Sequence, residues 1–379
     1  MKGVGIGLLG YGGIGKVHTL GYREIPYYYP GELPEVSLAA VCTTRRESAD
    51  AAARLGGFAR AYTEVEELVR DPAVTVVDCS LPNSAHKPAL LAALAAGKHV
   101  YCEKPLAVNA DDAREIAKAA ARSGGRLGMT FNYRYVPAVM RAKQLIAEGA
   151  LGEIYSFHFE YLHTGYQDPT RPLSWRMSRE ASGGGALFDL GSHVIDLARH
   201  LLGEFESLFA TAKTYVVERP LAAGSAEKGR VTVDDAMWLQ VLLAGGAPGT
   251  IHVSRFATGA LDGLLFRIEG RKGALKFDLM DGNWLYWYDA TRRGGAFGGD
   301  LGWTRLETVH QYPDAVIPPG RTILGWTRTH AECQYRFLKA VVAGEEPLPG
   351  LADGLAVQLV LEAAYASAEG GGWVKVERA

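Results

Sequence analysis

The stretch GVGIGLLGYGGIG, residues 3–15, decides how the first part of this chain folds. Its first seven residues are an apolar run typical of a buried strand, and Gly10-Tyr11-Gly12-Gly13-Ile14-Gly15 follows at once. In a G-x-G-x-x-G turn between a strand and a helix, the first glycine permits the tight turn. The second lets the backbone approach a pyrophosphate, and the third lets helix and strand pack closely. The N–H groups that open the helix then face the phosphates, so we predict a dinucleotide site here.

Strand-like and helix-like segments alternate from this turn to about residue 130. Apolar runs at 36–42, 74–80, 99–102 and 128–132 are separated by helical patterns. This alternation predicts an α/β fold, an N-terminal Rossmann domain with a doubly wound parallel sheet. Ligands of such sheets bind at the carboxyl ends of the strands. Besides the glycine turn, the expected cofactor contacts there are Thr43, Thr44, Arg45, Arg46, Ser80, Leu81, Pro82, Asn83, His86, Glu103, Lys104 and Asn132.

The end of the second strand bears on the choice of cofactor. An NAD-binding unit usually has an acidic residue there for the ribose 2′-hydroxyl. Here the chain reads Cys42-Thr43-Thr44-Arg45-Arg46-Glu47, without a carboxylate at the strand end. Arginine binds phosphate in a bidentate manner, so this sequence favours NADP. The alternatives stay open: the arginines could be solvated residues that open the next helix, and Glu47 keeps NAD possible.

The pattern changes after about residue 152. Strand-like runs with few helices between them occupy 154–161, 231–243, 249–256, 264–269, 274–278 and 284–288. They predict a C-terminal α+β domain whose large, mostly antiparallel sheet has helices on one face. We therefore expect residues 1–130 to form the dinucleotide-binding domain and residues 131–379 a domain for substrate binding and oligomerisation. The last helix, about 353–368, could pack back on the first domain.

The stretch GGGALFDLGSHVIDLARHLLG, residues 183–203, carries two stripes at helical spacing. One stripe is apolar, and the other places Asp189 and His193 one above the other on the same side of the helix. A carboxylate beside an imidazole is a common general base. The alternative is an aspartate that favours the helix dipole and a histidine packed in the core. Asp196 and His200, further along, we interpret as structural.

Bulk properties narrow the class of protein. A length of 379 residues predicts two domains. The formal net charge of −2 implies no basic face, which argues against nucleic acid as a partner. The four cysteines form no CxxC pair, which favours a reduced cytoplasmic interior. The N-terminus does not read as a signal peptide, and no apolar run approaches the roughly 18 residues of a membrane span.

Taken together, several motifs resemble one known family. They are the Gly10–Gly15 turn, Glu103-Lys104-Pro105, Asn132-Tyr133-Arg134, Trp175-Arg176 and the 183–203 stretch. This combination is similar to the Gfo/Idh/MocA oxidoreductases, over nearly the whole chain and most strongly over residues 3–203. The resemblance implies a nicotinamide enzyme for a sugar or cyclitol. Its catalytic lysine matches Lys104, its paired aspartate and histidine match Asp189 and His193, and it implies a cis bond before Pro105. Trp175 and Arg176 match a pair that lines the nicotinamide in some members.

Alcohol oxidation gives these residues definite roles. The cofactor accepts the hydride, and a protein group must accept the hydroxyl proton. His193 can act as the base, with its charge and tautomer set by Asp189. Lys104 can hydrogen-bond the substrate oxygen and stabilise alkoxide character. The expected substrate contacts are Lys104, Tyr133, Arg134, His163, Tyr166, Asp168, Arg176, Asp189 and His193.

Some of these expectations have alternatives. His163, Tyr166 and Asp168 lie in the loop HTGYQDPTRP, which could equally be a merely polar loop. No metal is expected, because nicotinamide-dependent oxidation needs none. We expect a homodimer or homotetramer. Two other functions remain open: an NAD-dependent glycosidase that works by transient oxidation and elimination, and a catalytically dead sugar-sensing binding protein.

Overall fold

The computed structural model describes residues 3–308 and 311–378, and the chain divides into two compact units. Unit 1 consists of residues 1–132 and 311–358, and unit 2 consists of residues 133–310 and 359–379. We expected everything after residue 130 to form one domain, but residues 311–358 belong to unit 1. Helix α10 (Leu351–Gly370) has its first turns in unit 1 and the remainder in unit 2.

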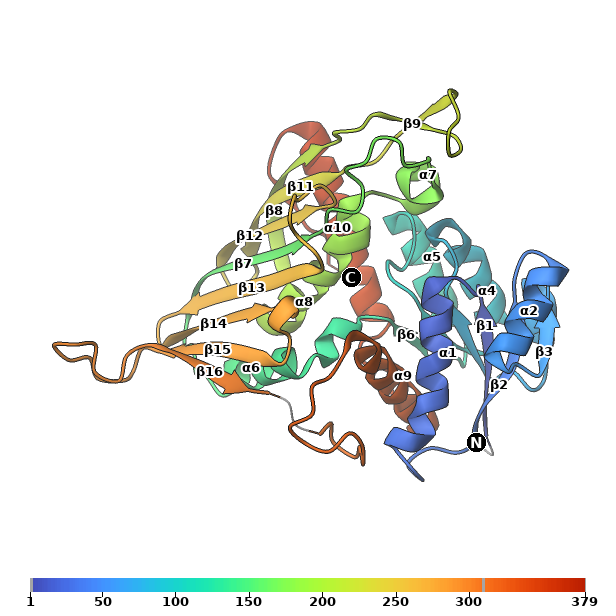
Figure 1. The fold of residues 1–379 in the computed structure, drawn as a ribbon, viewed down its shortest axis with the longest axis horizontal. Helices are drawn as coiled ribbons and strands as arrows, with labels where there is room; N and C mark the ends of the chain where they lie inside the picture. The colour runs from blue at the N-terminus through green and yellow to red at the C-terminus, as the bar shows by residue number, and fades with distance from the viewer. Residues whose placement is uncertain (1–2, 309–310, 379) are drawn as a thin grey trace. The chain divides into compact units, whose positions relative to one another are not determined.

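Unit 1 is built on a six-stranded parallel sheet with the order β3-β2-β1-β4-β5-β6. This order is that of a doubly wound sheet, so the predicted fold class is confirmed. The strands are β1 Val4–Leu9, β2 Val36–Cys42, β3 Arg60–Tyr62, β4 Val76–Cys79, β5 His99–Cys102 and β6 Leu127–Met129. The helices between them are α1 Gly13–Tyr28, α2 Arg46–Gly56, α3 Val65–Arg70, α4 His86–Ala95 and α5 Ala110–Ala120 (Figure 1).

Helix α9 (Trp326–Ala343), from the returning segment, packs against α1. The Gln334 side chain donates to the backbone carbonyl of His18 at 3.1 Å. The rings of Tyr29 and Tyr335 stack with their centroids 3.5 Å apart. In the tyrosine- and proline-rich segment at residues 26–34, Tyr29 is therefore buried within unit 1, whereas Tyr27 is exposed.

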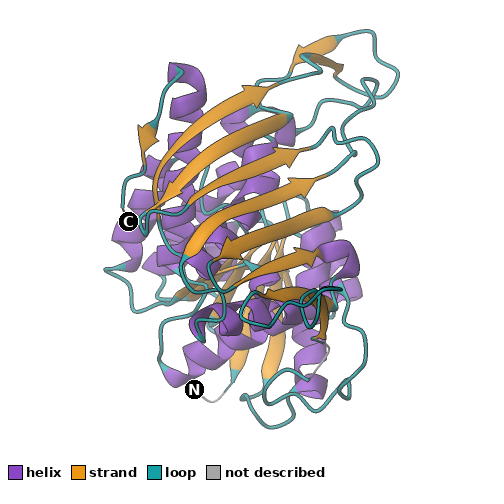
Figure 2. Ribbon diagram, turned by 90° about the vertical axis from the view of Figure 1, so that its left-hand side faces the viewer, coloured by secondary structure: helices purple, strands orange, loops and turns teal. Residues whose placement is uncertain are grey.

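Unit 2 contains a nine-stranded sheet with the order β16-β15-β14-β13-β7-β12-β11-β8-β17. Its strands lie side by side in one twisted layer (Figure 2), and all pairs are antiparallel except β7 with β12. The strands are β7 Ile154–Leu162, β8 Phe205–Lys213, β11 Ala236–Leu243, β12 Pro248–Ser254, β13 Gly263–Gly270, β14 Gly273–Asp278, β15 Trp284–Asp289, β16 Trp303–Glu307 and β17 Val374–Lys375. Two short strands, β9 Glu218–Pro220 and β10 Lys228–Arg230, pair separately. The predicted antiparallel sheet is confirmed.

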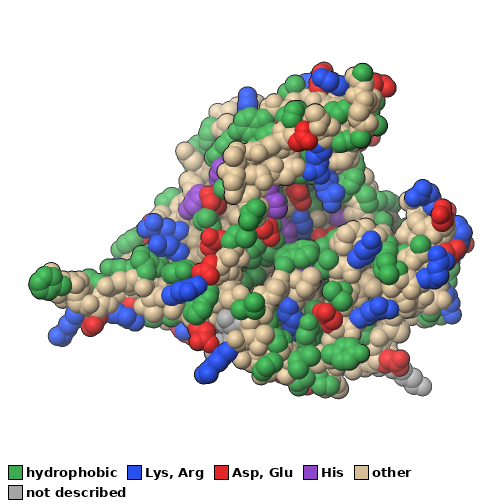
Figure 3. Space-filling view, viewed as in Figure 1, with side chains coloured by type: hydrophobic (Ala, Val, Ile, Leu, Met, Phe, Trp, Pro, Cys, Tyr) green, Lys and Arg blue, Asp and Glu red, His purple; other side chains and the backbone are tan. Residues whose placement is uncertain are grey.

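The other helices of unit 2 are α6 Pro137–Ala147, α7 Arg179–Ser182 and α8 Ser192–Leu202. Residues 187–191, which precede α8, form one turn of π-helix instead of the α-helix expected there. Helix α8 packs against β7, and the π-helical turn packs against β12. The long connection between β15 and β16 extends from the sheet (Figures 1 and 3), with Phe297 fully exposed. No helix among the described residues is long and apolar enough to cross a membrane.

Candidate active-site residues in the two units

The glycine turn of unit 1 has the geometry that a dinucleotide requires. Gly10 has a φ of +86°, and a Cβ there would lie 2.8 Å from the carbonyl oxygen of Ser80. A Cβ at Gly15 would lie 2.4 Å from the carbonyl oxygen of Gly10, so helix and strand approach as the motif predicts. At Gly12 and Gly13 an added Cβ would meet no atom within 4 Å, and no side chain caps α1. The backbone N–H groups there can receive a pyrophosphate.

The two arginines after β2 differ in what they contact. Arg46 donates to the carbonyl oxygen of Ala61 at 2.9 Å and lies 3.5 Å from Asp50. Arg45 is exposed, and its backbone carbonyl accepts hydrogen bonds from the hydroxyls of Thr43 and Ser48. Thr44 is exposed beside it. Of the two guanidinium groups, that of Arg45 is the better placed to bind a ligand.

The loop after β4 holds the next group of predicted contacts. Ser80 is buried, and its hydroxyl donates to Asp78 at 3.0 Å. Leu81, Pro82 and Asn83 are at least partly exposed. His86 is fully buried, with Nδ1 3.0 Å from the carbonyl oxygen of Pro105 and Nε2 3.0 Å from that of Leu81. We therefore interpret His86 as a link between two loops.

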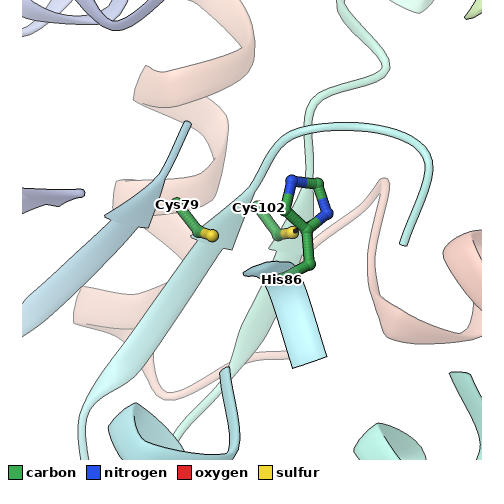
Figure 4. A group of neighbouring side chains, drawn as sticks. All are labelled: Cys79, His86 and Cys102. Atoms are coloured by element: carbon green, nitrogen blue, oxygen red, sulfur yellow. Dashed lines mark hydrogen bonds between the residues drawn. The ribbon is translucent and has the colours of Figure 1, made fainter. Parts of the chain in front are cut away.

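Two groups of side chains in unit 1 have metal-ligand chemistry: Cys79 with His86 and Cys102, and His18 with Glu103 and His330. Figure 4 shows the first group, in which the two cysteines come from neighbouring strands. Burial raises the pKa of the Cys102 thiol, and both nitrogens of His86 face backbone carbonyls. A metal would need thiolates and a free imidazole nitrogen, so this group fits a structural role better.

The segment after β5 contains the predicted catalytic lysine. The Lys104–Pro105 peptide bond is cis, as the family resemblance implied. Glu103 is buried, and its Oε1 lies 3.0 Å from Nε2 of His18. Lys104 is half-buried, and its backbone N–H donates to Oε2 of Glu103 at 3.2 Å. Asn132, also buried, donates to the hydroxyl of Thr329 at 3.0 Å.

In unit 2, Asp234 holds the end of the glycine segment at residues 183–185 through hydrogen bonds. The N–H groups of Gly185 and Leu187 donate to the two oxygens of this carboxylate, each at 2.9 Å. A Cβ at Gly185 would lie 1.8 Å from the backbone carbonyl oxygen of Asp234, so only glycine fits there. Asp234 thus satisfies N–H groups that the start of a helix leaves unpaired. It fixes the turn that carries Asp189.

The carboxylate of Asp189 is paired with an arginine. Nη2 of Arg255 donates to Oδ2 of Asp189 at 3.0 Å, while Nη1 donates to the carbonyl oxygen of Arg176 at 3.3 Å. The Arg255 side chain is 2% exposed and that of Asp189 is 34% exposed. Arg255 also lies over the ring of Tyr166, 4.5 Å from its centroid. Arg255 therefore orients the Asp189 carboxylate, part of which stays exposed.

His193 is bordered by two tyrosines that belong to a hydrogen-bonded chain. Its ring lies edge-to-face with those of Tyr133 and Tyr161, at centroid distances of 4.7 and 6.0 Å. Tyr161 donates to Asp262 at 2.7 Å, so its oxygen accepts from the Tyr133 hydroxyl, also at 2.7 Å. His163 lies 3.0 Å from the same carboxylate oxygen. These hydrogen bonds fix the orientation of the Tyr133 hydroxyl beside His193.

The remaining predicted substrate contacts have varied surroundings. Arg134 is buried in a bidentate ion pair with Asp196, at 2.5 and 2.8 Å, which agrees with the structural role expected for Asp196. Asp168 is exposed and accepts from the N–H and hydroxyl of Thr170. Arg176 is exposed and stacks over Trp175 at 4.4 Å. Arg134 and Asp168 are therefore occupied by structural contacts.

Sequence reasoning missed several residues that organise these sites: His18, Asp78, Tyr161, Asp234, Arg255 and Asp262. His18 has a local signal, since it is a polar residue on the buried face of a helix that opens with the glycine turn. Asp234 and Asp235 form an acidic pair just before a strand. Arg255 and Asp262 belong to no pattern, because their partners lie 66 and 101 residues away in the sequence.

A parallel sheet with an open glycine turn, together with a second unit built on a mostly antiparallel sheet, defines a dinucleotide-binding oxidoreductase. Residues 4–131 match the family model for oxidoreductases with an NAD-binding Rossmann fold, and residues 139–276 match the model of the GFO/IDH/MocA C-terminal domain. The chain belongs to the Gfo/Idh/MocA oxidoreductase family. The resemblance drawn from the sequence and the prediction of an NAD-binding oxidoreductase are confirmed.

Three relatives illustrate the similarity. Levoglucosan dehydrogenase of Pseudarthrobacter phenanthrenivorans is 34% identical, over 99% of each chain. A solved structure of levoglucosan dehydrogenase in complex with NADH and levoglucosan, also 34% identical, has a TM-score of 0.93 and covers 99% of this chain and 100% of its own. The scyllo-inositol 2-dehydrogenase (NADP(+)) of Bacillus subtilis is 29% identical over 72% of this chain and 71% of its own.

Proposed function

We propose that this enzyme is an NAD(P)-dependent dehydrogenase for a secondary alcohol of a monosaccharide, a sugar derivative or an inositol. The similarity to levoglucosan dehydrogenase over 99% of both chains supports a sugar derivative as the first choice. The observation that carries the proposal is a set of polar side chains in unit 2: His193 packs against Tyr133 and Tyr161, and Asp189, four positions earlier in the chain, is paired with Arg255. An imidazole, a carboxylate and tyrosine hydroxyls suit a substrate that carries several hydroxyls.

The bound nicotinamide supplies the hydride acceptor, and the residues of the chain manage the proton. His193 takes the hydroxyl proton of the substrate. Its ring orientation is fixed by the two tyrosine rings against which it packs. Asp189, held by Arg255, supplies negative charge that favours the protonated imidazole formed in this step. Tyr133, whose hydroxyl is hydrogen-bonded to Tyr161, borders the substrate beside His193.

Lys104 has the complementary role. Its ammonium group hydrogen-bonds the oxygen that becomes a carbonyl and stabilises the negative charge on it before the hydride leaves. The Lys104→Ala variant tests this role. We expect kcat to fall about 10²- to 10³-fold, the effect of removing one oxyanion donor, with the affinity for the dinucleotide retained. A variant that binds the dinucleotide and oxidises sugars at the wild-type rate would refute the assignment.

For the cofactor we favour NADP over NAD, on Arg45 and Thr44, since Arg46 is partly engaged by Ala61 and Asp50. The NADP(+) dependence in the name of the inositol relative is compatible with this choice, whereas the NADH complex of levoglucosan dehydrogenase favours NAD. Fluorescence titration of wild type and Arg45→Ala with NADH and NADPH decides the matter. If the substitution leaves the ratio of the NADH and NADPH affinities unchanged, Arg45 does not bind the 2′-phosphate.

A single assay separates the three possible functions. The wild-type enzyme is incubated with NAD or NADP and a panel of levoglucosan, hexoses, glucosides and inositols, while absorbance at the reduced-nicotinamide band is followed. Steady formation of NAD(P)H with a free sugar supports the dehydrogenase. Release of a free sugar from a glycoside without net reduction supports the glycosidase. Binding without any turnover supports the sensor.

We also propose that the enzyme acts as a homodimer or homotetramer in the cytoplasm. Exposed aromatic side chains on the strands of unit 2, Tyr155, Trp238 and Trp303, support association of subunits. The four cysteines are all free and buried, which suits a reducing compartment. Light scattering after size-exclusion chromatography tests the first statement, since a monomer at micromolar concentration would contradict it.

A further inference from the structure

The buried side chain of His18 takes no part in the chemistry described above. It lies on α1, just past the glycine turn, and is fully buried. Nδ1 lies 2.9 Å from both carboxylate oxygens of Asp78, and Nε2 lies 3.0 Å from Oε1 of Glu103. Asp78 belongs to β4 and Glu103 follows β5 directly. One imidazole therefore bridges the carboxyl ends of two adjacent strands.

This arrangement determines the charge of the ring. A neutral imidazole has one N–H donor and one acceptor nitrogen, and an acceptor nitrogen cannot bind a carboxylate. With a carboxylate at each nitrogen, His18 is the doubly protonated cation. Burial by itself lowers its pKa, but the charges and hydrogen bonds of Asp78 and Glu103 raise it to about 10. The same contacts bring the pKa of Glu103 down to about 2, although burial opposes this.

The other groups that face His18 are compatible with a protonated His18 ring. Tyr22 and Ser80 donate hydrogen bonds to the Asp78 carboxylate, at 2.8 and 3.0 Å. The ring of Tyr101 lies at a centroid distance of 5.5 Å. His330 lies at 5.7 Å, and burial together with the positive charge of His18 lowers its pKa to about 3. His330 is therefore neutral, and His18 is the cation of this cluster.

The cluster ends at the predicted catalytic lysine. Oε2 of Glu103 accepts the backbone N–H of Lys104, at 3.2 Å, while Oε1 faces His18. The Lys104 ammonium also contributes to the low pKa of Glu103. Two carboxylates, one imidazolium and one ammonium add up to zero net charge. Moving any of them would leave a buried charge uncompensated, so the cluster has one strongly preferred arrangement.

We propose that His18, as an imidazolium cross-link between Asp78 and Glu103, is a positioning residue that fixes the backbone of Glu103–Pro105 and thereby aims Lys104 at the substrate oxygen. Glu103, which the sequence suggested as a cofactor contact, then serves as the anchor of this lysine. The aiming of Lys104 rests on the proposed dehydrogenase function. The cross-link itself does not, because it is a property of unit 1 alone.

The cross-link is tested first, without any substrate. The full-length protein is labelled with ¹³C at the ε1 position of histidine, and its NMR spectrum is recorded between pH 5.5 and 8.5. The His18→Gln variant assigns the His18 resonance by its disappearance. We expect the wild-type resonance to keep the imidazolium chemical shift over the whole range. A titration midpoint near the ordinary value of about 6.5 would overturn the proposal.

The positioning role is tested by kinetics on His18→Gln, Glu103→Gln and the double variant. We expect kcat to fall about 10²-fold, as for a catalytic group displaced by about 1 Å, with KM and the NADH affinity nearly unchanged. The double variant should be no slower than either single variant, because both break the same link. His99→Gln is the matched control: His99 is at the other end of β5, where it accepts the backbone N–H of Arg126.

Each other outcome has a definite meaning. If the fold-losses of kcat in the two single variants multiply in the double variant, the positioning role is overturned. The same holds if the affinity for NADH falls as much as kcat. If the wild-type enzyme oxidises no sugar, the proposed function fails, and the NMR titration still decides on the cross-link. If His18→Gln does not fold, Glu103→Gln, which keeps the pair with Asp78, replaces it in both experiments. The His18 resonance is then the one that this substitution shifts most.

Discussion

Each unit contains a histidine among tyrosines, and the two differ in what fixes the imidazole. His18 in unit 1 has a carboxylate at each ring nitrogen, whereas the ring of His193 in unit 2 packs edge-to-face against Tyr133 and Tyr161. Carboxylates on both sides hold the charge of the ring as well as its position. Aromatic neighbours hold the position of the ring without adding a charge that favours one protonation state. Only the second arrangement suits a residue that must exchange a proton in every turnover.

The same contrast exists between two aspartates of unit 2. Asp196 is buried, with both carboxylate oxygens bound by Arg134. Asp189 keeps 34% of its side chain exposed and receives one hydrogen bond from Arg255. The two aspartates are seven positions apart in the sequence, and both lie beside the same apolar stripe. The role of each aspartate therefore depends on the partner that it meets. Four experiments test how such partners affect these side chains.

The largest effect is expected for His193→Ala. Loss of a general base typically costs about 10²- to 10⁴-fold in rate, so kcat should fall by that factor, with the NADH affinity and the melting temperature close to wild type. Stopped-flow single-turnover measurements and thermal denaturation check both statements. If the protein melts much earlier and its residual rate is unaffected, His193 is structural, like His18.

Next in size is Asp196→Asn. Removing the charge of one partner from a buried ion pair costs about 3–5 kcal/mol, because Arg134 would keep an uncompensated charge. Urea denaturation measures the free energy of unfolding. The KM for the sugar should not change, since the Arg134 side chain serves Asp196 and not the substrate. Asp168→Asn, at an exposed carboxylate, is the control and should leave stability nearly unchanged.

The third prediction concerns the pH dependence of stability. The pKa of His18 is raised to about 10 in the folded state, so between about pH 6.5 and 10 the folded protein holds a proton that the unfolded chain has lost. The contribution of His18 to the free energy of unfolding is complete below pH 6.5. Above this pH it decreases by up to about 1.4 kcal/mol per pH unit. For Glu103, whose pKa is lowered, the contribution is present above about pH 4.5 and is lost as the pH falls toward 2.

Urea denaturation of wild type and His18→Gln between pH 6 and 10 tests this prediction. The free energy of unfolding of the wild type should fall steadily with pH over this range, and that of the variant should fall much less. Parallel curves would show that His18 does not hold an extra proton in the folded state. In that case His18 would not differ from His193 in having a fixed charge.

The smallest effect is expected for Tyr161→Phe, which removes the hydroxyl between Tyr133 and Asp262. Two hydrogen bonds are lost, and only the one to Tyr133 involves a residue that contacts His193. One hydrogen bond is worth about 0.5–1.5 kcal/mol, so kcat/KM should fall by a few-fold to about ten-fold. Tyr155→Phe, at an exposed tyrosine of the same strand, is the control and should be neutral. If both variants behave alike, the hydrogen-bonded chain does not orient the Tyr133 oxygen.

The sequence predicted the local elements well where a residue pattern is repeated. The glycine turn, the apolar runs of unit 1 and the antiparallel runs of unit 2 follow from short-range sterics and burial, which act within a few residues. The strand β2, for example, has the predicted bounds, Val36–Cys42. The π-helical turn at 187–191 was not predicted, because a switch of the backbone hydrogen bonds from i+4 to i+5 has no characteristic residue pattern.

The candidate site was only partly accessible to the same reasoning. Motifs pointed to Lys104, Asp189 and His193, whose assignment as catalytic residues remains a prediction. They also pointed to Arg134, which the fold uses in a buried ion pair. They could not show that Arg255 pairs with Asp189, or that residues 311–358 return to unit 1 and place His330 beside His18. Side chains far apart in the sequence leave no periodic trace of such contacts.

The amino-acid sequence alone thus determined the class of fold, the family and the chemistry of the residues in play, because glycine conformations, burial patterns and functional groups are properties of single residues and their neighbours. The tertiary structure alone decided which partners each of these groups meets. Two histidines and two aspartates of equal chemical ability acquire different neighbours and exposures through residues supplied by other strands and helices. Burial and long-range pairing set the free energy of ionisation, and these exist only once the chain has folded.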